Sequence, residues 1–125
     1  MKIIIIPDPE KANSLKISAK ISLRRLNLTQ KEEFPSNTLT DYYDILHKLM
    51  ESYSLKKGIK FKGKGAHYEL INFICNEKRL KENQRVLLQK MRELRNEISY
   101  EGRLIPSSFI SDNEKTIKEI IQSFP

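Results

Sequence analysis

The residues best suited to chemistry lie in the stretch Leu94–Gly102, which closes the longest helical pattern in the chain. Arg95 could hold a phosphate group, Asn96 could orient a phosphate or a 2′-hydroxyl, and Tyr100 could donate a hydrogen bond. At 3.6 residues per turn, Arg95 and Tyr100 lie about 140° apart on the helix, whereas Asn96 and Tyr100 share a face. We therefore take these three as candidate catalytic residues that border one groove, with another element packed between them.

This stretch resembles the signature of HEPN-domain proteins, in which an Arg and a polar residue precede a His about one turn later on a long helix. Arg95 and Asn96 match the first two positions, and Tyr100 stands at the His position. A second stretch, Gly58–Phe61 followed by Ala66–Ile71, is similar to the segment that joins the middle helices of archaeal HEPN-like proteins. The resemblance implies a small helical bundle that commonly dimerises.

The resemblance also implies a class of function. Many HEPN proteins are metal-independent ribonucleases, often toxins paired with a nucleotidyltransferase antitoxin, and others are not catalytic. A tyrosine has an ordinary pKa of about 10, so it cannot exchange protons near neutral pH as a histidine of about 6.5 does. We therefore expect an RNA- or nucleotide-binding protein with weak or lapsed endoribonuclease activity. The alternative is a non-enzymatic module that binds a protein such as a nucleotidyltransferase.

The charge of the chain favours polyanionic partners. Its 125 residues carry a formal net charge of +7, which favours RNA, DNA, nucleotides or an acidic protein. Lysines crowd the segment 56–64, with Phe61 among them as a base-stacking candidate. A solvated surface loop has the same composition, so that interpretation stays open. The candidate nucleic-acid contacts are Lys57, Lys60, Lys62, Lys64, Arg92 and Arg103.

The sequence has few residues that could bind a metal ion or act as a reactive thiol. His47, His67 and Cys75 are the only imidazole and thiol groups, and their spacing does not form a zinc site, so we predict no metal and no cofactor. The single Cys75 fits a reducing compartment and a small buried hydrophobe. His67 is the one imidazole that could replace the proton chemistry missing at Tyr100, although an exposed histidine at a helix start is the simpler interpretation. His47 has no partner in helical register.

Apolar periodicity and capping signals predict an all-α fold in a single domain, 1–125. The resemblance implies that this fold is an up-and-down, HEPN-like bundle of four to five helices. Residues 1–7 form an extended N-terminal arm, which packs on the bundle or pairs with a partner. The apolar residues of the first helix occupy two sides, which favours a homodimer. Ser111 begins a capping box for the last helix. The expected helices cover about 9–28, 38–57, 66–75, 82–101 and 112–123.

Two further expectations concern location and an alternative partner. The apolar run Ile3–Ile6 is far shorter than the ~20 residues of a membrane span, so we expect a cytoplasmic protein without a membrane segment. A basic helical DNA-binding protein is a third hypothesis. The long lysine-rich middle loop disfavours it, because a helix-turn-helix motif needs a tight turn.

Overall fold

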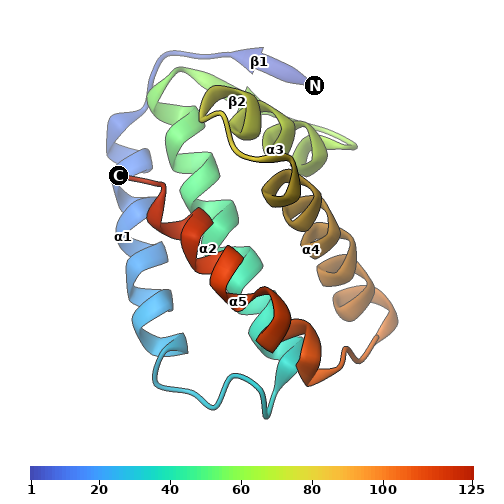
Figure 1. Cartoon of the computed structure of the whole chain (residues 1–125). Helices are drawn as coiled ribbons and strands as arrows, with labels where there is room; N and C mark the ends of the chain where they lie inside the picture. The colour runs from blue at the N-terminus through green and yellow to red at the C-terminus, as the bar shows by residue number, and fades with distance from the viewer.

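The computed structural model describes all 125 residues, and five helices account for most of them (Figure 1). The helices stand roughly side by side, and a two-stranded sheet closes one end of the bundle. The predicted all-α bundle is thus confirmed. No helix has the length and hydropathy that a bilayer-spanning segment requires. The elements are β1 (Lys2–Ile4), α1 (Pro9–Leu26), α2 (Pro35–Lys56), β2 (Ile59–Phe61), α3 (Ala66–Glu77), α4 (Glu82–Glu101) and α5 (Ser107–Gln122).

Helix α2 is the centre of the bundle, because it packs against all four other helices. Its apolar side chains recur every three or four residues, as predicted, and burying such a stripe is the main source of stability for a helix in a small domain. The core also takes side chains from α1, α3, α4 and α5. The fully buried members from α2 are Leu39, Tyr42, Tyr43, Ile45, Leu46 and Met50.

The N-terminal arm pairs within its own chain. β1 runs antiparallel to β2, with Ile3 opposite Lys60, so the arm covers the segment between α2 and α3. The amino group of Met1 adds an ion pair of 2.8 Å with Glu69 on α3. The predicted extended arm is therefore present, and its partner is the middle segment that we expected to be a loop.

Two helix starts were predicted wrongly. α2 begins at Pro35, not Thr38, because proline suits a first helical position, where its missing N–H would have no partner. α5 begins at Ser107, five residues before the predicted start. The supposed capping residue Ser111 lies inside α5, where its hydroxyl donates to the carbonyl oxygen of Ser108. The four polar residues from Ser111 to Glu114 have the sequence of a capping box, but they lie within a helix that begins earlier.

The turn from α2 into β2 depends on Gly58. Its φ of +73° is left-handed, and a Cβ there would lie 2.7 Å from the carbonyl oxygen of Ile5. We predict that Gly58→Ala lowers the free energy of unfolding by about 2 kcal/mol or more, because strain and a backbone clash add together. Gly63 is the matched control, since it has a φ of +82° and a Cβ there would meet no atom within 4 Å. Urea denaturation of both variants measures the difference, and equal losses would contradict the clash.

Candidate functional site

Two histidines that lie far apart in the sequence come into contact in the fold, with their rings tilted by 32°. His47 lies on α2 and His67 in the first turn of α3, and their ring centroids are 4.2 Å apart. The Tyr43 ring lies one turn before His47, with its centroid 6.2 Å from His47 and 6.3 Å from His67. We call the surface around these rings the imidazole cleft; it is formed by Tyr43, Asp44, His47, Glu51, His67, Arg92 and Arg95.

Local backbone geometry places His67 against α2. Gly65 precedes α3 in a left-handed conformation with φ of +81°, which turns the chain sharply after β2. Ala66 and His67 therefore enter the helix beside α2. The apolar face of α3, which includes Leu70, Ile71 and Ile74, packs in the core and fixes this approach. A glycine turn and a buried helix face thus bring the two imidazoles together.

Arg95 reaches the cleft from α4. Its Nε lies 3.5 Å from Oδ1 of Asp44 on α2, and its side chain is 29% exposed. The same Nε is buried and makes no hydrogen bond. The Arg92 guanidinium, one turn earlier, lies 5.6 Å from the centroid of the Tyr68 ring. Two guanidinium groups therefore border the imidazoles, and Arg95 keeps a donor unused.

The cleft keeps both imidazoles in their neutral form at neutral pH. Burial and the neighbouring His67 lower the pKa of His47, although Glu51 and Asp44 oppose the shift. His67 is exposed in the first turn of α3, and the partial burial of its ring, followed by the positive charge of Arg95, lowers its pKa. A pKa below the usual 6.5 leaves an imidazole free to accept a proton at pH 7. The pair can therefore do the proton chemistry that Tyr100 cannot.

Tyr43 connects the imidazoles to the core. Its hydroxyl lies 3.4 Å from Nδ1 of His67, within hydrogen-bonding distance. Burial raises the pKa of Tyr43 to about 12, so the phenol stays protonated at neutral pH. The contact occupies one ring nitrogen of His67 and leaves Nε2 for other partners.

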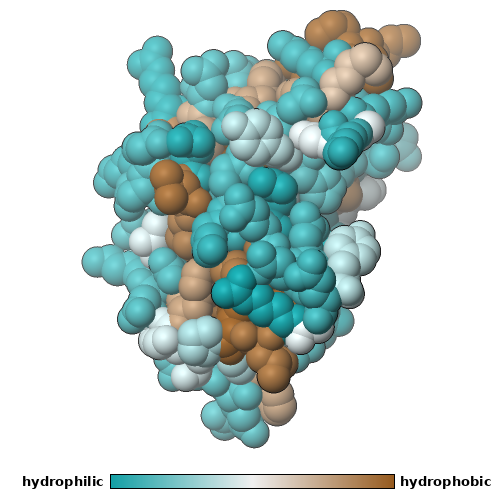
Figure 2. Space-filling view, turned by 90° about the vertical axis from the view of Figure 1, so that its right-hand side faces the viewer, coloured by the Kyte–Doolittle hydropathy of each residue, from teal (hydrophilic) through white to brown (hydrophobic).

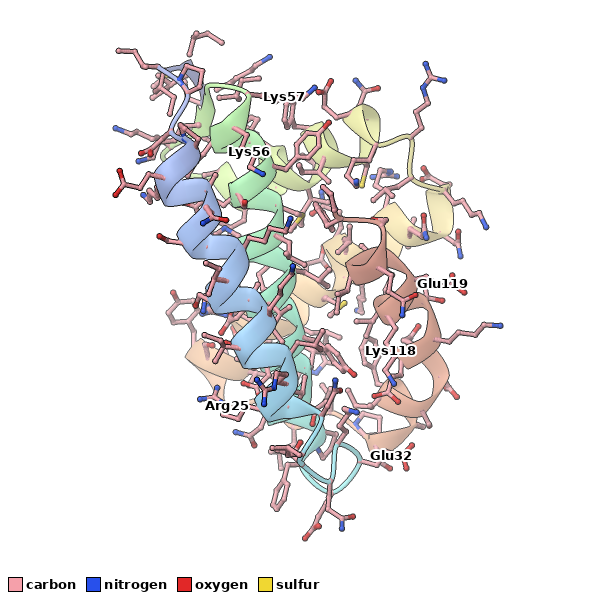
Figure 3. All side chains as sticks on the ribbon, turned by 90° about the vertical axis from the view of Figure 1, so that its left-hand side faces the viewer. Arg25, Glu32, Lys56, Lys57, Lys118 and Glu119 are labelled. Carbon is pink, nitrogen blue, oxygen red and sulfur yellow. The ribbon has the colours of Figure 1, made fainter.

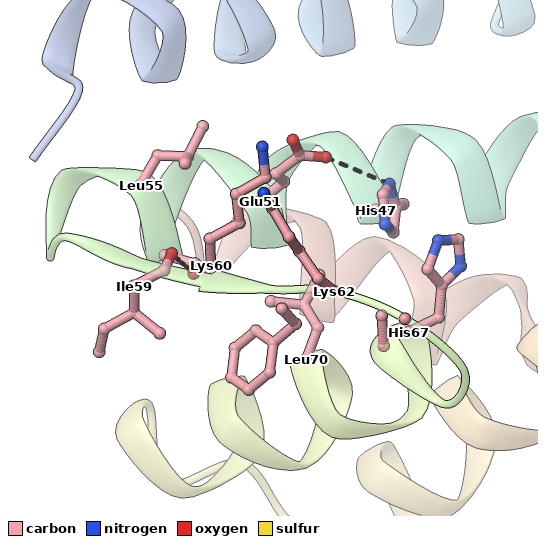
Figure 4. Close-up of a pocket in the computed structure, with 12 residues that line it drawn as sticks. His47, Glu51, Leu55, Ile59, Lys60, Lys62, His67 and Leu70 are labelled. Atoms are coloured by element: carbon pink, nitrogen blue, oxygen red, sulfur yellow. Dashed lines mark hydrogen bonds and ion pairs between the residues drawn. The ribbon is translucent and has the colours of Figure 1, made fainter. Parts of the chain in front are cut away.

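A pocket of about 180 Å³ opens beside the imidazoles, between α2, β2 and the start of α3 (Figure 4). His47 and His67 lie at one end of it, and Glu51 lies on the α2 side. Lys60 on β2 and Lys62 directly after it line the pocket and extend toward Glu51, yet neither forms an ion pair. The pocket therefore offers cationic donors and a carboxylate acceptor next to the two histidines.

The predicted catalytic residues do not all meet in this cleft. Arg95 faces α2, where it pairs with the Asp44 carboxylate, and Asn96 is half-buried beside it in sequence. Tyr100 is 81% exposed near the C-terminal end of α4 and borders no groove with Arg95. Arg103 pairs with Glu97 at the end of the same helix. The tertiary structure therefore separates Tyr100 and Arg103 from the imidazole cleft and keeps Arg95 in it.

The lysine segment also divides. Lys57 forms an ion pair of 3.0 Å with Glu77, whereas Lys60 and Lys62 line the pocket and Lys64 is exposed after β2. Phe61, which we considered for base stacking, is half-buried and packs on Phe73 with ring centroids 5.5 Å apart. Lys60, Lys62 and Lys64 form no ion pair. Phe61, the aromatic residue among them, packs against another side chain and is not free to stack on a base.

Sequence reasoning undervalued His47, because its partner lies on another helix. The pattern did contain a signal: Tyr43, His47 and Glu51 fall four residues apart and hence share one face of α2. Cys75 behaves as predicted, since it is buried and burial raises its pKa to about 11. No cluster of three or more His, Cys, Asp or Glu side chains is arranged to hold a metal ion.

The electrostatic link between Arg95 and His67 can be measured. We predict that Arg95→Gln raises the pKa of His67, because it removes a positive charge that disfavours the imidazolium. The titration of the imidazole resonances by NMR reports this pKa directly. Arg85→Gln is the control on the same helix, since Arg85 pairs with Glu82 away from the cleft. A His67 pKa that is unchanged in Arg95→Gln would show that the two groups are not coupled.

Comparison with known protein families, curated proteins and solved structures finds no match to this chain. A proposal for its function therefore depends on the residues of the imidazole cleft and the adjoining pocket.

Proposed function

We propose that the protein binds RNA, or a nucleotide, through phosphate held at the imidazole cleft, and that it cleaves RNA there slowly without a metal ion. The observation that carries the proposal is the contact between His47 and His67, with 4.2 Å between ring centroids, beside the guanidinium of Arg95. Neutral imidazoles next to fixed positive charge can exchange protons with a bound phosphodiester. The partners that the HEPN resemblance implies are a second copy of the chain and a nucleotidyltransferase.

The charges around the cleft suit a phosphate group. Lys60 and Lys62 have no ion-pair partner, and Nε of Arg95 makes no hydrogen bond. Arginine and lysine donors are the usual partners of phosphate oxygens. The one nearby carboxylate that pairs with Arg95, Asp44, is half-buried and approaches only to 3.5 Å. The guanidinium of Arg95, whose side chain is 29% exposed, would thus donate to the phosphate, and the two unpaired lysines of the adjoining pocket would add positive charge.

The cleavage step needs only groups that the cleft contains. His67 accepts the proton of a ribose 2′-hydroxyl, and the 2′-oxygen forms a bond to phosphorus. The bond from phosphorus to the 5′-oxygen then breaks, and that oxygen takes a proton from the imidazolium or from water. Arg95 stabilises the negative charge that develops on the phosphate oxygens. The products are a 2′,3′-cyclic phosphate and a 5′-hydroxyl.

Binding can be tested through its salt dependence. We predict that Lys60→Ala/Lys62→Ala weakens binding of a single-stranded RNA and reduces the salt slope by about 0.7 for each phosphate that the lysines no longer neutralise. Fluorescence anisotropy at several salt concentrations measures both quantities. Lys20→Ala/Lys115→Ala is the matched control, because it removes the same charge from exposed positions on α1 and α5. Equal effects of the two double variants would contradict a local lysine site.

Cleavage can be tested by substituting the proton-transfer group. We predict that native protein generates a 2′,3′-cyclic phosphate in the presence of EDTA, and that His67→Ala lowers the rate about 10²- to 10⁴-fold. Arg95→Ala should lower it as well, because the developing phosphate charge loses its partner. Tyr100→Phe should cleave at the native rate, since this side chain is 81% exposed and away from the cleft.

Circular dichroism would confirm that each variant is folded. If native protein, His67→Ala and Arg95→Ala are equally inert on a panel of RNAs, cleavage is excluded. Bound RNA without cleavage would leave the binding function and support a lapsed enzyme. Loss of activity in Tyr100→Phe would return the proton transfer to the position indicated by the HEPN-like motif.

Exposed apolar side chains favour a second candidate, a dimerising interaction module. Ile17 and Ile21, one turn apart on the outer face of α1, are 51% and 62% exposed, and Tyr100 and Leu104 are more than 80% exposed at the end of α4. α1 is in front in Figure 3, and the opposite side of the molecule, in Figure 2, also has apolar areas among hydrophilic ones. Sedimentation of a monomer at micromolar concentration would argue against a homodimer.

A further inference from the structure

The pocket beside the imidazole cleft has the size of one planar ring system. Its volume of about 180 Å³ is below the 300–1,000 Å³ typical of sites for whole drug-sized ligands. His47 and His67 form one end of the pocket, and the charge of Arg95 acts on His67 at that end. A nucleotide could therefore place its phosphate at the cleft and its base in the pocket.

The register of the small sheet leaves backbone groups free toward this pocket. Met1 and Lys62 exchange two backbone hydrogen bonds, and the N–H of Ile5 donates to the carbonyl oxygen of Gly58. Bonded pairs alternate in an antiparallel ladder, so the N–H and C=O of Ile59 and Phe61 point away from β1. Ser54 on α2 donates to the Ile59 carbonyl oxygen, so this carbonyl points away from β1 and toward α2. Phe61 has no such partner, and it lines the pocket.

Glu51 supplies an acceptor on the opposite side of the pocket. Its carboxylate oxygens lie 3.9 Å from Nζ of Lys11 and 3.8 Å from Nδ1 of His47, and neither distance is that of a hydrogen bond. The side chain is 28% exposed. Both oxygens can therefore accept hydrogen bonds from a ligand, while the Phe61 N–H can donate to it.

We propose that this pocket binds a guanine base, so that guanosine nucleotides or the guanosine positions of RNA are the preferred ligands. The Watson–Crick edge of guanine carries two adjacent N–H donors, N1 and N2, which match the two oxygens of Glu51. Its O6 accepts from the Phe61 N–H. Adenine and cytosine offer one exocyclic donor beside an acceptor nitrogen, and that ring nitrogen would face the carboxylate without a proton. The inference rests on the proposed phosphate site, since it names the base that accompanies that phosphate.

The test compares nucleoside monophosphates on the native protein by isothermal titration calorimetry. GMP should bind about 10-fold or more tightly than AMP, CMP or UMP, because a matched pair of hydrogen bonds discriminates to that degree. IMP, which lacks the N2 amino group, should bind more weakly than GMP. This comparison needs no variant and so does not depend on a substituted protein folding.

The variant Glu51→Gln should reduce the ratio of GMP to AMP affinity toward one, because an amide cannot accept both hydrogen bonds. Glu77→Gln is the control, since Glu77 pairs with Lys57 outside the pocket. Loss of the Glu51 charge can raise the affinity for every nucleotide through its phosphate. The ratio of the GMP and AMP affinities is compared because this general gain cancels in it. Equal binding of all four nucleotides, with binding still weakened in Arg95→Ala, would overturn the guanine site and leave the phosphate site intact. A protein that binds neither nucleotides nor RNA would overturn both.

Discussion

Burial of one helix, α2, controls the rest of this structure. Its apolar seam contacts every other helix of the bundle, so each neighbour is positioned by the same set of side chains. Tyr43 belongs both to this buried set and to the rim of the imidazole cleft. Because the next residues along its face are His47 and Glu51, the packing that stabilises the fold also holds the chemical groups in place.

The cleft combines neutral bases with fixed positive charge. An imidazole next to arginine loses affinity for its proton, and burial of the ring acts in the same direction. An anion that binds between these groups offsets the charge of Arg95 and restores affinity for the proton. In the proposed function, phosphate binding and proton transfer at His67 would therefore be coupled through one electrostatic environment.

The two-stranded sheet separates the lysines by environment. Pairing of β1 with β2 fixes the register at Lys60 opposite Ile3, which directs Lys60 and Lys62 along the pocket while Phe61 packs inward on Phe73. Lys57 precedes the strand and is neutralised by Glu77. Charges that form one cluster in the sequence thus have different partners, because a strand alternates its side chains whereas a loop does not.

The sequence by itself determined the helical architecture, since apolar spacing and helix termini depend on residues close together in the chain. It located α4 from Glu82 to Glu101 and the apolar seam of α2. It also singled out Arg95, whose place beside the apolar stripe brings it to α2. The ends of α2 and α5 were less accurate, because several polar residues near each start could serve as a cap.

Only the tertiary structure decided which side chains share a site. His47 and His67 are twenty residues apart on different helices, and no periodicity within one helix relates them. Their contact depends on the left-handed turn at Gly65 and on the packing of α3 against α2. Tyr100, five residues after Arg95, is instead directed to solvent by the rotation of α4. Spacing along one helix fixes direction around its axis, whereas contact between helices depends on how their buried faces pack.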